Sequence, residues 1–198
     1  RVSAWTRLVK RAFDLALAGA GLVIASPLLV LAAQAIWIED GFPVIYRQQR
    51  AGRNGRPFTL YKFRSMRHDA EGETPVWAAD ADPRVTAVGR ALRTTRLDEL
   101  PQLWNVLRGD MSFVGPRPER PFFVAQLAAQ IPFYEQRHAV RPGITGWAQV
   151  KYRYGASVED ALEKLRYDLY YIKHLSIGFD VTILVDTVKV ILFGKGAK

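Results

Sequence analysis

The sequence predicts an α+β fold that is mostly helical, with an N-terminal re-entrant membrane helix broken in its middle, a small β-hairpin and amphipathic helices at the membrane interface. Three observations predict it. Residues 15–38 form a long run without a charged residue, two β-prone stretches flank a Gly-containing turn at 52–55, and helical patterns follow from residue 88 onward.

The apolar run from Leu15 to Ile38 is long enough to cross a bilayer, since about 18 apolar residues suffice. Ser26-Pro27 lies in its middle, where proline removes a backbone donor and clashes with the preceding turn, so we expect a kink or a break. Each half of roughly 11–12 residues then reaches about 17 Å, about halfway through a ~30 Å hydrocarbon core. A spanning helix and a buried core helix are the alternatives.

Basic residues flank both ends of this run, at positions 1, 7, 10 and 11 before it and at 47, 50, 53 and 56 after it. Cytoplasmic flanks of membrane helices are enriched in Lys and Arg. A helix that enters, bends at Ser26-Pro27 and leaves by the same face puts both flanks on that side, whereas a spanning helix puts only one there. We therefore expect a re-entrant helix, with Trp5 and Trp37 at the interface.

The elements after the run follow from β-propensity and from Gly/Pro punctuation. Pro43–Tyr46 and Phe58–Phe63 should pair as a β-hairpin around the turn 52–55. Helical segments are expected at 88–93, 97–106, 122–130 and 133–138, and loops at 68–84, 108–121 and 141–147.

The last two helices have clearer signals. Ser157 caps a helix that runs to about His174, with Asp160 at the third helical position as in a capping box. The final helix, Phe179–Phe193, mixes Asp and Thr with large apolar residues. It is either an amphipathic helix packed on the core or a helix that lies on the membrane, and the pattern favours neither.

Composition limits the functional classes. The net charge of +9 favours an anionic partner, which is nucleic acid, anionic lipid or a phosphorylated substrate. The absence of cysteine excludes disulfides and thiol chemistry. No G-x-S-x-G, P-loop or G-x-G-x-x-G motif is present and the three histidines lack metal-site spacing, which argues against hydrolase-triad, nucleotide-triphosphatase and Rossmann functions.

Asp98 and Glu99 are the main candidates for chemistry. An acidic pair at a helix start is most often structural, because free N–H groups and the helix dipole stabilise it there. Adjacent helical residues point about 100° apart, so one carboxylate can attack phosphorus while the other holds a metal or orients a group. Such an attack needs charge neutralisation by Mg²⁺ and by Arg or Lys.

Cations set in strands and loops supply that neutralisation. Lys62 and Arg64 lie two apart on a predicted strand and therefore share a face. Arg117 lies between two prolines, which limits its backbone freedom and suits a bidentate grip on phosphate. Each cation alone is more often a solvated surface residue; the candidates for phosphate binding are Lys62, Arg64, Arg93, Arg117, Arg141 and Arg153.

Taken together, the motifs resemble the catalytic domain of the bacterial sugar transferases, the monotopic polyprenol-phosphate phosphoglycosyl transferases, in their exopolysaccharide-initiating branch. The resemblance covers nearly the whole chain. It is carried by KRAFD at 10–14, the run with Ser26-Pro27, YKFRSM at 61–66, LDELPQLWNVLRGDMSFVGPRPE at 97–119, RPGITGWAQV at 141–150 and YDLYYIKHLS at 167–176.

The resemblance implies transfer of a hexose 1-phosphate from a UDP-sugar to undecaprenyl phosphate with release of UMP, the first membrane step of exopolysaccharide synthesis. It implies Mg²⁺ held by Asp98 and Glu99, and a covalent phosphosugar intermediate on Asp98. Glu99 would help with the metal or activate the prenol phosphate. Basic positions of the family's active site match Lys62, Arg93, Arg117 and Arg153.

The same resemblance implies an organisation and a location. Residues 1–40 would be the re-entrant membrane helix, and residues 41–198 a catalytic domain on the cytoplasmic face of the bacterial inner membrane, with both in one structural unit. The partners would be the UDP-sugar, undecaprenyl phosphate and membrane lipids, without nucleic acid; a homodimer stays open. Larger family members carry a further N-terminal membrane region, and the start at Arg1 is consistent with a piece of such an enzyme.

One departure bears on the sugar. Members that handle N-acetylated sugars often have Asn-Gly before the arginine at position 153, whereas this chain has Lys151-Tyr152. This difference favours glucose or galactose. Two other functions are less consistent with the sequence: the scattered basic residues argue against a membrane-bound nucleic-acid module, and the intact Asp-Glu pair argues against a non-catalytic scaffold.

Overall fold

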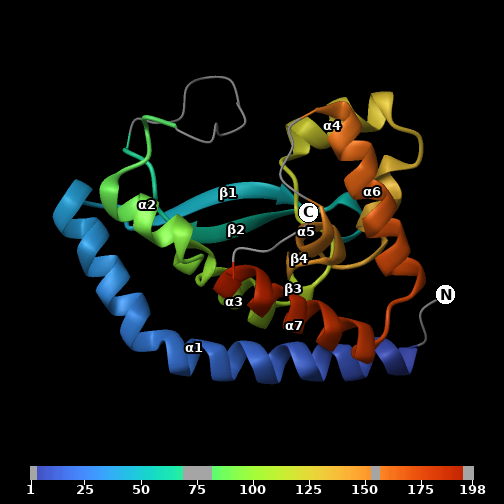
Figure 1. The fold of residues 1–198 in the computed structure, drawn as a ribbon, viewed down its shortest axis with the longest axis horizontal. Coiled ribbons are helices and arrows are strands. Elements are labelled where there is room, and N and C mark those ends of the chain that lie inside the picture. Colours follow the sequence, from blue (N-terminus) through green and yellow to red (C-terminus); the bar gives the residue numbers. More distant parts are fainter. Residues whose placement is uncertain (1–3, 69–81, 153–156, 194–198) are drawn as a thin grey trace.

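The computed structural model describes residues 4–68, 82–152 and 157–193. Helices dominate, and four short or medium strands form two separate two-stranded sheets within the described residues. The predicted α+β, mostly helical class with one long apolar N-terminal helix is therefore confirmed. Figure 1 shows this helix, α1, along one edge of the molecule, with the β-hairpin above it and α4 and α6 at the far end.

The apolar run lies within α1 (Ala4–Asp40), a continuous helix of 37 residues with Pro27 inside it. Figure 1 shows α1 bending in its middle, so that its second half turns toward α2. The Ser26 hydroxyl donates to the Val23 carbonyl at 2.8 Å, next to the backbone position where proline has no donor. The expected interruption is thus a bend rather than a break, because helical bonding continues on both sides of Pro27.

The environment of α1 bears on the three interpretations of the run. By length and composition, it is the one helix of the described residues that could cross a membrane. Large apolar side chains in its middle are exposed, including Val23, Ile24 and Leu31, and few of its residues are buried. This exposure disfavours the buried core helix. The re-entrant path stays a prediction.

The predicted hairpin is present, and its first strand is longer than expected. Strand β1 (Ile45–Ala51) pairs antiparallel with β2 (Pro57–Phe63), and the 3₁₀ turn η1 (Arg53–Gly55) joins them. The run of four polar residues at positions 47–50 hid the length of β1, because these residues lack β-propensity but still complete the ladder. The buried Asn105 fixes the hairpin on α3 (Gln102–Arg108) by accepting from Tyr61 N at 3.0 Å and donating to Thr59 O at 2.7 Å.

The segment before α3 differs from the predicted helix 97–106. Helix α2 (Ala87–Thr94) agrees with the expected 88–93, but the next helix is divided into the 3₁₀ turn η2 (Leu97–Glu99) and α3. Pro101 stands at the junction, and its missing N–H explains why α3 begins after it. Most of the loop predicted at 68–84 lies outside the described residues.

Two short strands lie within the segments predicted as ordered loops. Strand β3 (Ser112–Val114) pairs in parallel with β4 (Gly143–Thr145). The backbones approach so closely that a Cβ on Gly115 would lie 2.4 Å from the Arg141 carbonyl oxygen. Because glycine has no Cβ, Gly115 and Gly143 allow the two backbones to come this close. The pairing of β3 with β4 thereby brings two Gly/Pro segments that are distant in sequence side by side.

The second half of the chain is largely as predicted. It contains α4 (Pro121–Gln130), the 3₁₀ helix η3 (Tyr134–Ala139), the short α5 (Trp147–Lys151), α6 (Val158–Lys173) and α7 (Ile177–Phe193). The capping box of α6 is present: Ser157 Oγ accepts from Asp160 N, and the Asp160 carboxylate accepts from Ser157 N, both at 3.0 Å.

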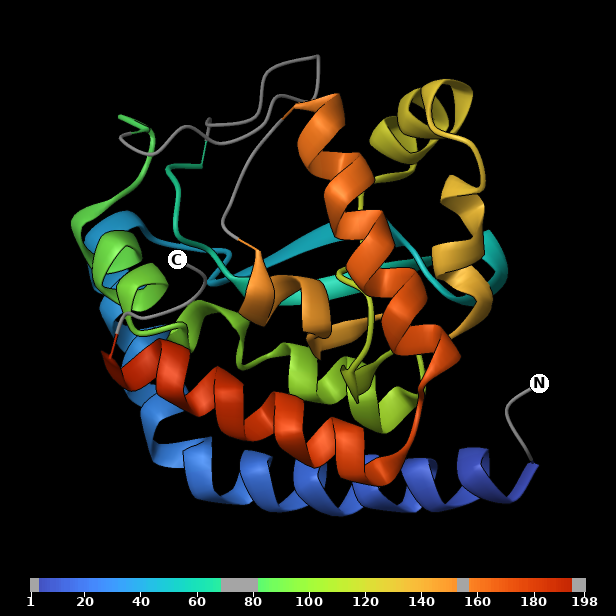
Figure 2. The ribbon, with the colours of Figure 1, turned by 45° about the vertical axis from the view of Figure 1, so that its right-hand side comes forward.

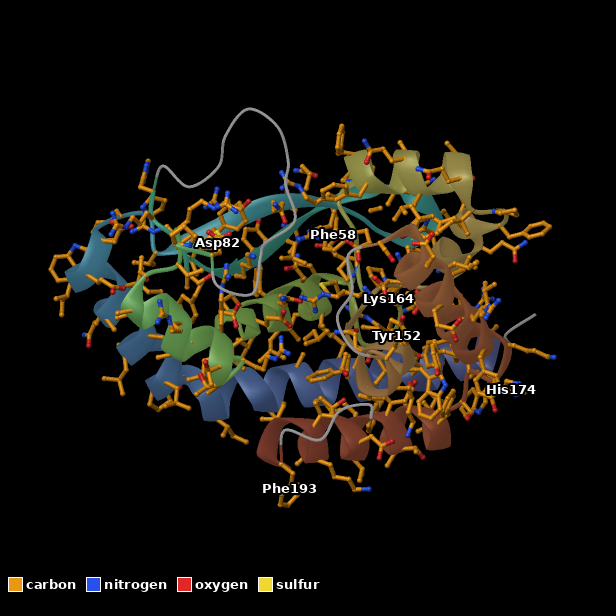
Figure 3. The ribbon with its side chains drawn as sticks, turned by 45° about the horizontal axis from the view of Figure 1, so that its top comes forward. Phe58, Asp82, Tyr152, Lys164, His174 and Phe193 are labelled. Atoms are coloured by element: carbon orange, nitrogen blue, oxygen red, sulfur yellow. The ribbon has the colours of Figure 1, made fainter. Side chains whose placement is uncertain are left out.

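Helix α7 packs on the core, as one interpretation of its pattern expects, whereas its position on a membrane stays a prediction. Ile183 is fully buried in a cluster with Val114, Val150 and Tyr171, whereas Val185 and Ile191 are exposed on its other face. Figures 1 and 2 show α7 beside the first half of α1, and an ion pair between Lys10 and Asp180 joins the two helices. Figure 3 shows Phe193 at the outer end of α7, where its side chain is exposed.

Candidate active site

The acidic pair lies in η2, between α2 and α3. Arg96 adopts a left-handed backbone conformation, with φ 60°, and turns the chain from α2 into η2. Asp98 is buried, with 8% of its surface exposed, and Glu99 is partly buried. The sequence placed both residues in the first turn of a longer helix. The structure holds them in an isolated turn, so the tertiary surroundings determine where the two carboxylates point.

Glu99 is held by Arg117. Arg117 Nη2 lies 2.7 Å from Glu99 Oε1, and this cation comes from the predicted Pro-Arg-Pro loop. Burial acts to raise the pKa of Glu99, but the charge and hydrogen bond of Arg117 outweigh it, and the pKa is lowered. Glu99 is therefore a stable anion.

The backbone of Arg117 is itself held by a hydrogen bond. Its carbonyl oxygen accepts a hydrogen bond from Arg137 Nη2 at 3.0 Å. Arg137 is buried and pairs with the buried Asp168 at 2.8 Å. This chain of contacts, from Asp168 through Arg137 to Arg117 and Glu99, connects α6 and η3 to the acidic turn. Sequence reasoning missed Arg137 and Asp168, because no local pattern indicates a long-range buried ion pair.

Asp98 differs from its neighbour. Across the described part of the chain, no residue donates a hydrogen bond to its carboxylate or forms an ion pair with it. Burial and the adjacent Glu99 raise the pKa of Asp98, against the opposing effect of nearby cations. A carboxylate that is desolvated and unpaired retains its lone pairs for a ligand, and a higher pKa makes it a stronger nucleophile.

Three of the predicted cations gather around this carboxylate. Lys62, Arg93 and Arg117 all act electrostatically on Asp98, although they come from β2, α2 and the loop after β3. The Arg93 Nε donates to Ser65 Oγ at 2.8 Å, which fixes its side chain. Burial, followed by repulsion from Arg50 and Arg93, lowers the pKa of Lys62 to about 8. The site therefore concentrates positive charge next to a free carboxylate.

Arg50 acts electrostatically on Lys62, and it was predicted only as part of a basic flank. It lies on β1, on the same face as Tyr46 and Lys62, which are paired in the ladder. Its Nη1 donates to the Pro118 carbonyl at 3.0 Å. The alternation of side chains along β1 was the available signal, and the unrecognised length of this strand concealed it.

The other three predicted cations are not brought to Asp98 by any described contact. Arg64 is buried and donates to the carbonyls of Asp40 and Gly41, at 2.7 and 2.8 Å, so it anchors the end of α1. Arg141 lines a separate cavity at the other end of α1. Arg153 lies outside the described residues.

The acidic pair fits a Mg²⁺ ion that is coordinated partly by the protein and partly by the substrate. Mg²⁺ usually takes one or two carboxylates and completes its shell with water and substrate phosphates. Asp98 and Glu99 supply two adjacent carboxylates, one of them without a protein donor. In the described part of the chain, no cluster of three or more His, Cys, Asp or Glu side chains could enclose a metal.

Comparisons with known proteins identify the family of the chain. Residues 5–194 match the family described as bacterial sugar transferase. The chain is 47% identical over 190 residues to a UDP-N-acetylgalactosamine-undecaprenyl-phosphate N-acetylgalactosaminephosphotransferase of Aeromonas hydrophila, covering 96% of this chain and 45% of the relative.

Two relatives named for glucose are similar to a comparable degree. A UDP-glucose:undecaprenyl-phosphate glucose-1-phosphate transferase of Escherichia coli is 45% identical over 94% of this chain and 41% of its own length. The enzyme of the same name from Caulobacter vibrioides is 43% identical over 93% of this chain and 70% of its own length. The chain thus spans less than half the length of the first two relatives.

Proposed function

Because this chain belongs to the bacterial sugar transferase family, we propose that it transfers a hexose 1-phosphate from a UDP-sugar to undecaprenyl phosphate and releases UMP. The names of its relatives specify undecaprenyl phosphate as acceptor and a sugar phosphate as the transferred group. The observation that carries the proposal is the free, buried Asp98 carboxylate, which lies beside the Glu99–Arg117 ion pair and among cations suited to a diphosphate.

The first step is a displacement at phosphorus. An Asp98 oxygen attacks the β-phosphorus of the UDP-sugar, and the bond from this phosphorus to the oxygen bridging the two phosphates breaks. UMP leaves with the electron pair, and the sugar phosphate is joined to Asp98 as an acyl phosphate. Lys62, Arg93 and Arg117 stabilise the negative charge that develops on the phosphate oxygens.

The second step returns Asp98 to its starting state. A phosphate oxygen of undecaprenyl phosphate attacks the same phosphorus, and the bond to Asp98 breaks. The products are undecaprenyl diphosphosugar and the free Asp98 carboxylate, which is ready for the next reaction cycle. Glu99, kept anionic by Arg117, holds the Arg117 guanidinium, which orients the incoming phosphate.

Mg²⁺, when held by Asp98 and Glu99 together with the substrate diphosphate, would neutralise charge on the phosphates and make UMP a better leaving group. The residues of the chain perform the remaining tasks. The burial of Asp98 excludes water from the acyl phosphate, and the fixed Arg117 holds the phosphate in line with the attacking oxygen.

The proposed location is the cytoplasmic face of the inner membrane, with α1 re-entrant. Both halves of α1 pack on the same body: Ala18 lies in a cluster with Leu60 and Val106, and Ile36 in one with Phe63 and Leu92. A straight spanning helix cannot keep both contacts while that body stays in water. At this face a soluble UDP-sugar and a lipid phosphate both reach Asp98, as the first membrane step of exopolysaccharide synthesis requires.

The transferred sugar is proposed to be glucose or galactose, because Lys151-Tyr152 replaces the Asn-Gly pair that members handling N-acetylated sugars often have. Overall similarity does not decide this point, since relatives named for N-acetylgalactosamine and for glucose match at 47% and 45% identity. UMP release measured over a panel of UDP-sugars with undecaprenyl phosphate identifies the sugar directly. Faster UMP release from UDP-N-acetylhexosamines than from UDP-glucose and UDP-galactose would contradict the proposed glucose or galactose specificity.

The decisive test of the mechanism is Asp98→Asn. The amide lacks the nucleophilic oxygen anion, so UMP release and the radiolabelled phosphosugar adduct on the protein should both fall below detection. Glu163→Gln is the matched control: it removes a carboxylate charge on the exposed side of α6 and should leave both signals intact. Near-normal UMP release by Asp98→Asn would exclude Asp98 as nucleophile.

A further inference from the structure

A second basic cavity lies away from the acidic pair. It measures about 820 Å³ and lies between the first turns of α1, the hairpin turn η1 and the end of α6. Volumes of roughly 300–1,000 Å³ are typical of small-molecule sites. Neither the acidic pair nor the three cations around Asp98 line it. Figure 3 shows His174, the neighbour of the lining residue Lys173, at the junction of α6 and α7.

The walls of this cavity carry an excess of positive charge. One carboxylate, Asp14, lines it; its Oδ1 accepts hydrogen bonds from Ser112 Oγ and Phe113 N at 3.0 Å, and its buried Oδ2 has no hydrogen-bond partner among the described residues. The charge of Lys10 is neutralised by Asp180. The remaining four cations form no ion pair or side-chain hydrogen bond with any residue in the described ranges: Arg7, Arg53, Arg141 and Lys173.

These cations are held together by the fold rather than by local sequence. They come from α1, η1, the segment before β4 and the end of α6. Burial, followed by the repulsion of Arg11 and Arg53, lowers the pKa of Arg141. Converging like charges without a counter-ion oppose folding, and a bound anion removes that repulsion. Guanidinium groups suit phosphate in particular, because they donate two parallel hydrogen bonds.

We propose that this cavity binds a phosphate group, which belongs to an anionic phospholipid headgroup or to a soluble phosphate ester. Its position favours the lipid. Trp5 and Leu8, on another face of the same turns of α1, are 71% and 62% exposed. Tryptophan is favoured at the membrane–water interface, so the cavity lies at about the depth of lipid headgroups. This inference does not depend on the transferase reaction.

The test is a binding titration of the detergent-solubilised protein with dioctanoyl phosphatidylglycerol, dioctanoyl phosphatidylcholine and inorganic phosphate. We expect saturable binding of phosphatidylglycerol that Arg141→Gln weakens by about tenfold or more, the range of one lost charge-assisted hydrogen bond. Arg53→Gln, on the exposed turn, tests the same point if Arg141→Gln fails to fold. Saturable binding of inorganic phosphate with the same dependence on Arg141 would identify a soluble phosphate ester as the source.

Arg56→Gln is the matched control, because it removes the same charge three residues from Arg53 but does not line the cavity. It should change the affinity by less than about twofold. The proposal is overturned if neither anion binds saturably, if phosphatidylcholine binds as tightly as phosphatidylglycerol, or if Arg56→Gln weakens binding as much as Arg141→Gln. Each of these results would indicate general surface attraction instead of a site.

Discussion

At the scale of single residues, the site depends on the difference between two adjacent carboxylates. Glu99 receives the Arg117 guanidinium at 2.7 Å, while Asp98 receives no donor from the described chain. The first is thereby kept anionic and fixed, and the second keeps its lone pairs and a raised pKa. A small difference in surroundings thus supports the two roles proposed above.

Arg137 offers a test of how Arg117 is positioned. Arg137→Met removes the donor to the Arg117 carbonyl and leaves Asp168 buried without its cation. We expect kcat/KM for UMP release to fall about tenfold or more, together with a lower melting temperature.

The double variant Arg137→Met/Asp168→Leu separates positioning from stability. Replacing both members of a buried ion pair by apolar groups restores much of the stability. If Arg137 positions Arg117, the melting temperature recovers while kcat/KM stays low. Recovery of both would mean that Arg137 acts on stability alone.

The lowered pKa of Lys62 predicts that the rate of UMP release depends on pH. Its pKa of about 8 lies below the usual 10.5, so its positive charge is present below pH 8 and is lost as the pH rises through that value. We expect kcat/KM for UMP release to decline above pH about 8. Lys62→Arg keeps the charge and should move that decline to higher pH. An unchanged alkaline limb in Lys62→Arg would assign the titration to another group.

At the scale of elements, α1 combines an apolar segment long enough to cross a membrane with two contacts to the folded body. Its middle is apolar and exposed, and the bend lets both halves pack on that body. The proline therefore has a structural consequence beyond the local loss of a hydrogen bond.

The re-entrant path can be tested by labelling. The chain has no native cysteine, so single substitutions at Arg7 and at Arg53 report without background. These residues line one cavity although α1 separates them in sequence. A membrane-impermeant thiol reagent should label both from the cytoplasmic side of inverted vesicles. Labelling from opposite sides would establish a spanning helix.

At the scale of the whole molecule, the first and last helices hold the fold together. Lys10 of α1 donates to Asp180 of α7 and to the Val114 carbonyl at 3.1 Å, and Tyr171 of α6 also donates to Asp180. Figure 2 shows α7 lying along the first half of α1. This buried polar cluster joins α1 to the body of the protein.

The contribution of the Lys10–Asp180 ion pair to the free energy of unfolding can be measured. Lys10→Met leaves Asp180 buried without its cation, and we expect a loss of about 3 kcal/mol in unfolding free energy. Lys189→Met removes an exposed ion pair from the same α7 and should cost less than about 1 kcal/mol. Thermal unfolding in detergent compares the two. Equal shifts would show that the Lys10–Asp180 pair has no special role.

Several elements were predictable because their signals are local. The hairpin turn, the capping box at Ser157 and Asp160 and the apolar stretch of α1 each depend on neighbours in sequence. The pairing of β3 with β4 was not predictable, because three-residue strands in Gly/Pro loops carry no periodicity. The placements of Arg64 and Arg141 also differ from the sequence interpretation, since a cation's partner depends on segments far along the chain.

The family resemblance, the mostly helical class, the long apolar segment and the identity of the acidic pair all follow from the amino-acid sequence, because motifs, composition and local propensity are properties of neighbouring residues. The folded chain was needed to find which cations surround Asp98, that Arg117 holds Glu99, that Arg137 supports Arg117, and that a second basic cavity lies beside Arg141. Charge interactions depend on distance and burial, and both are set when remote segments pack.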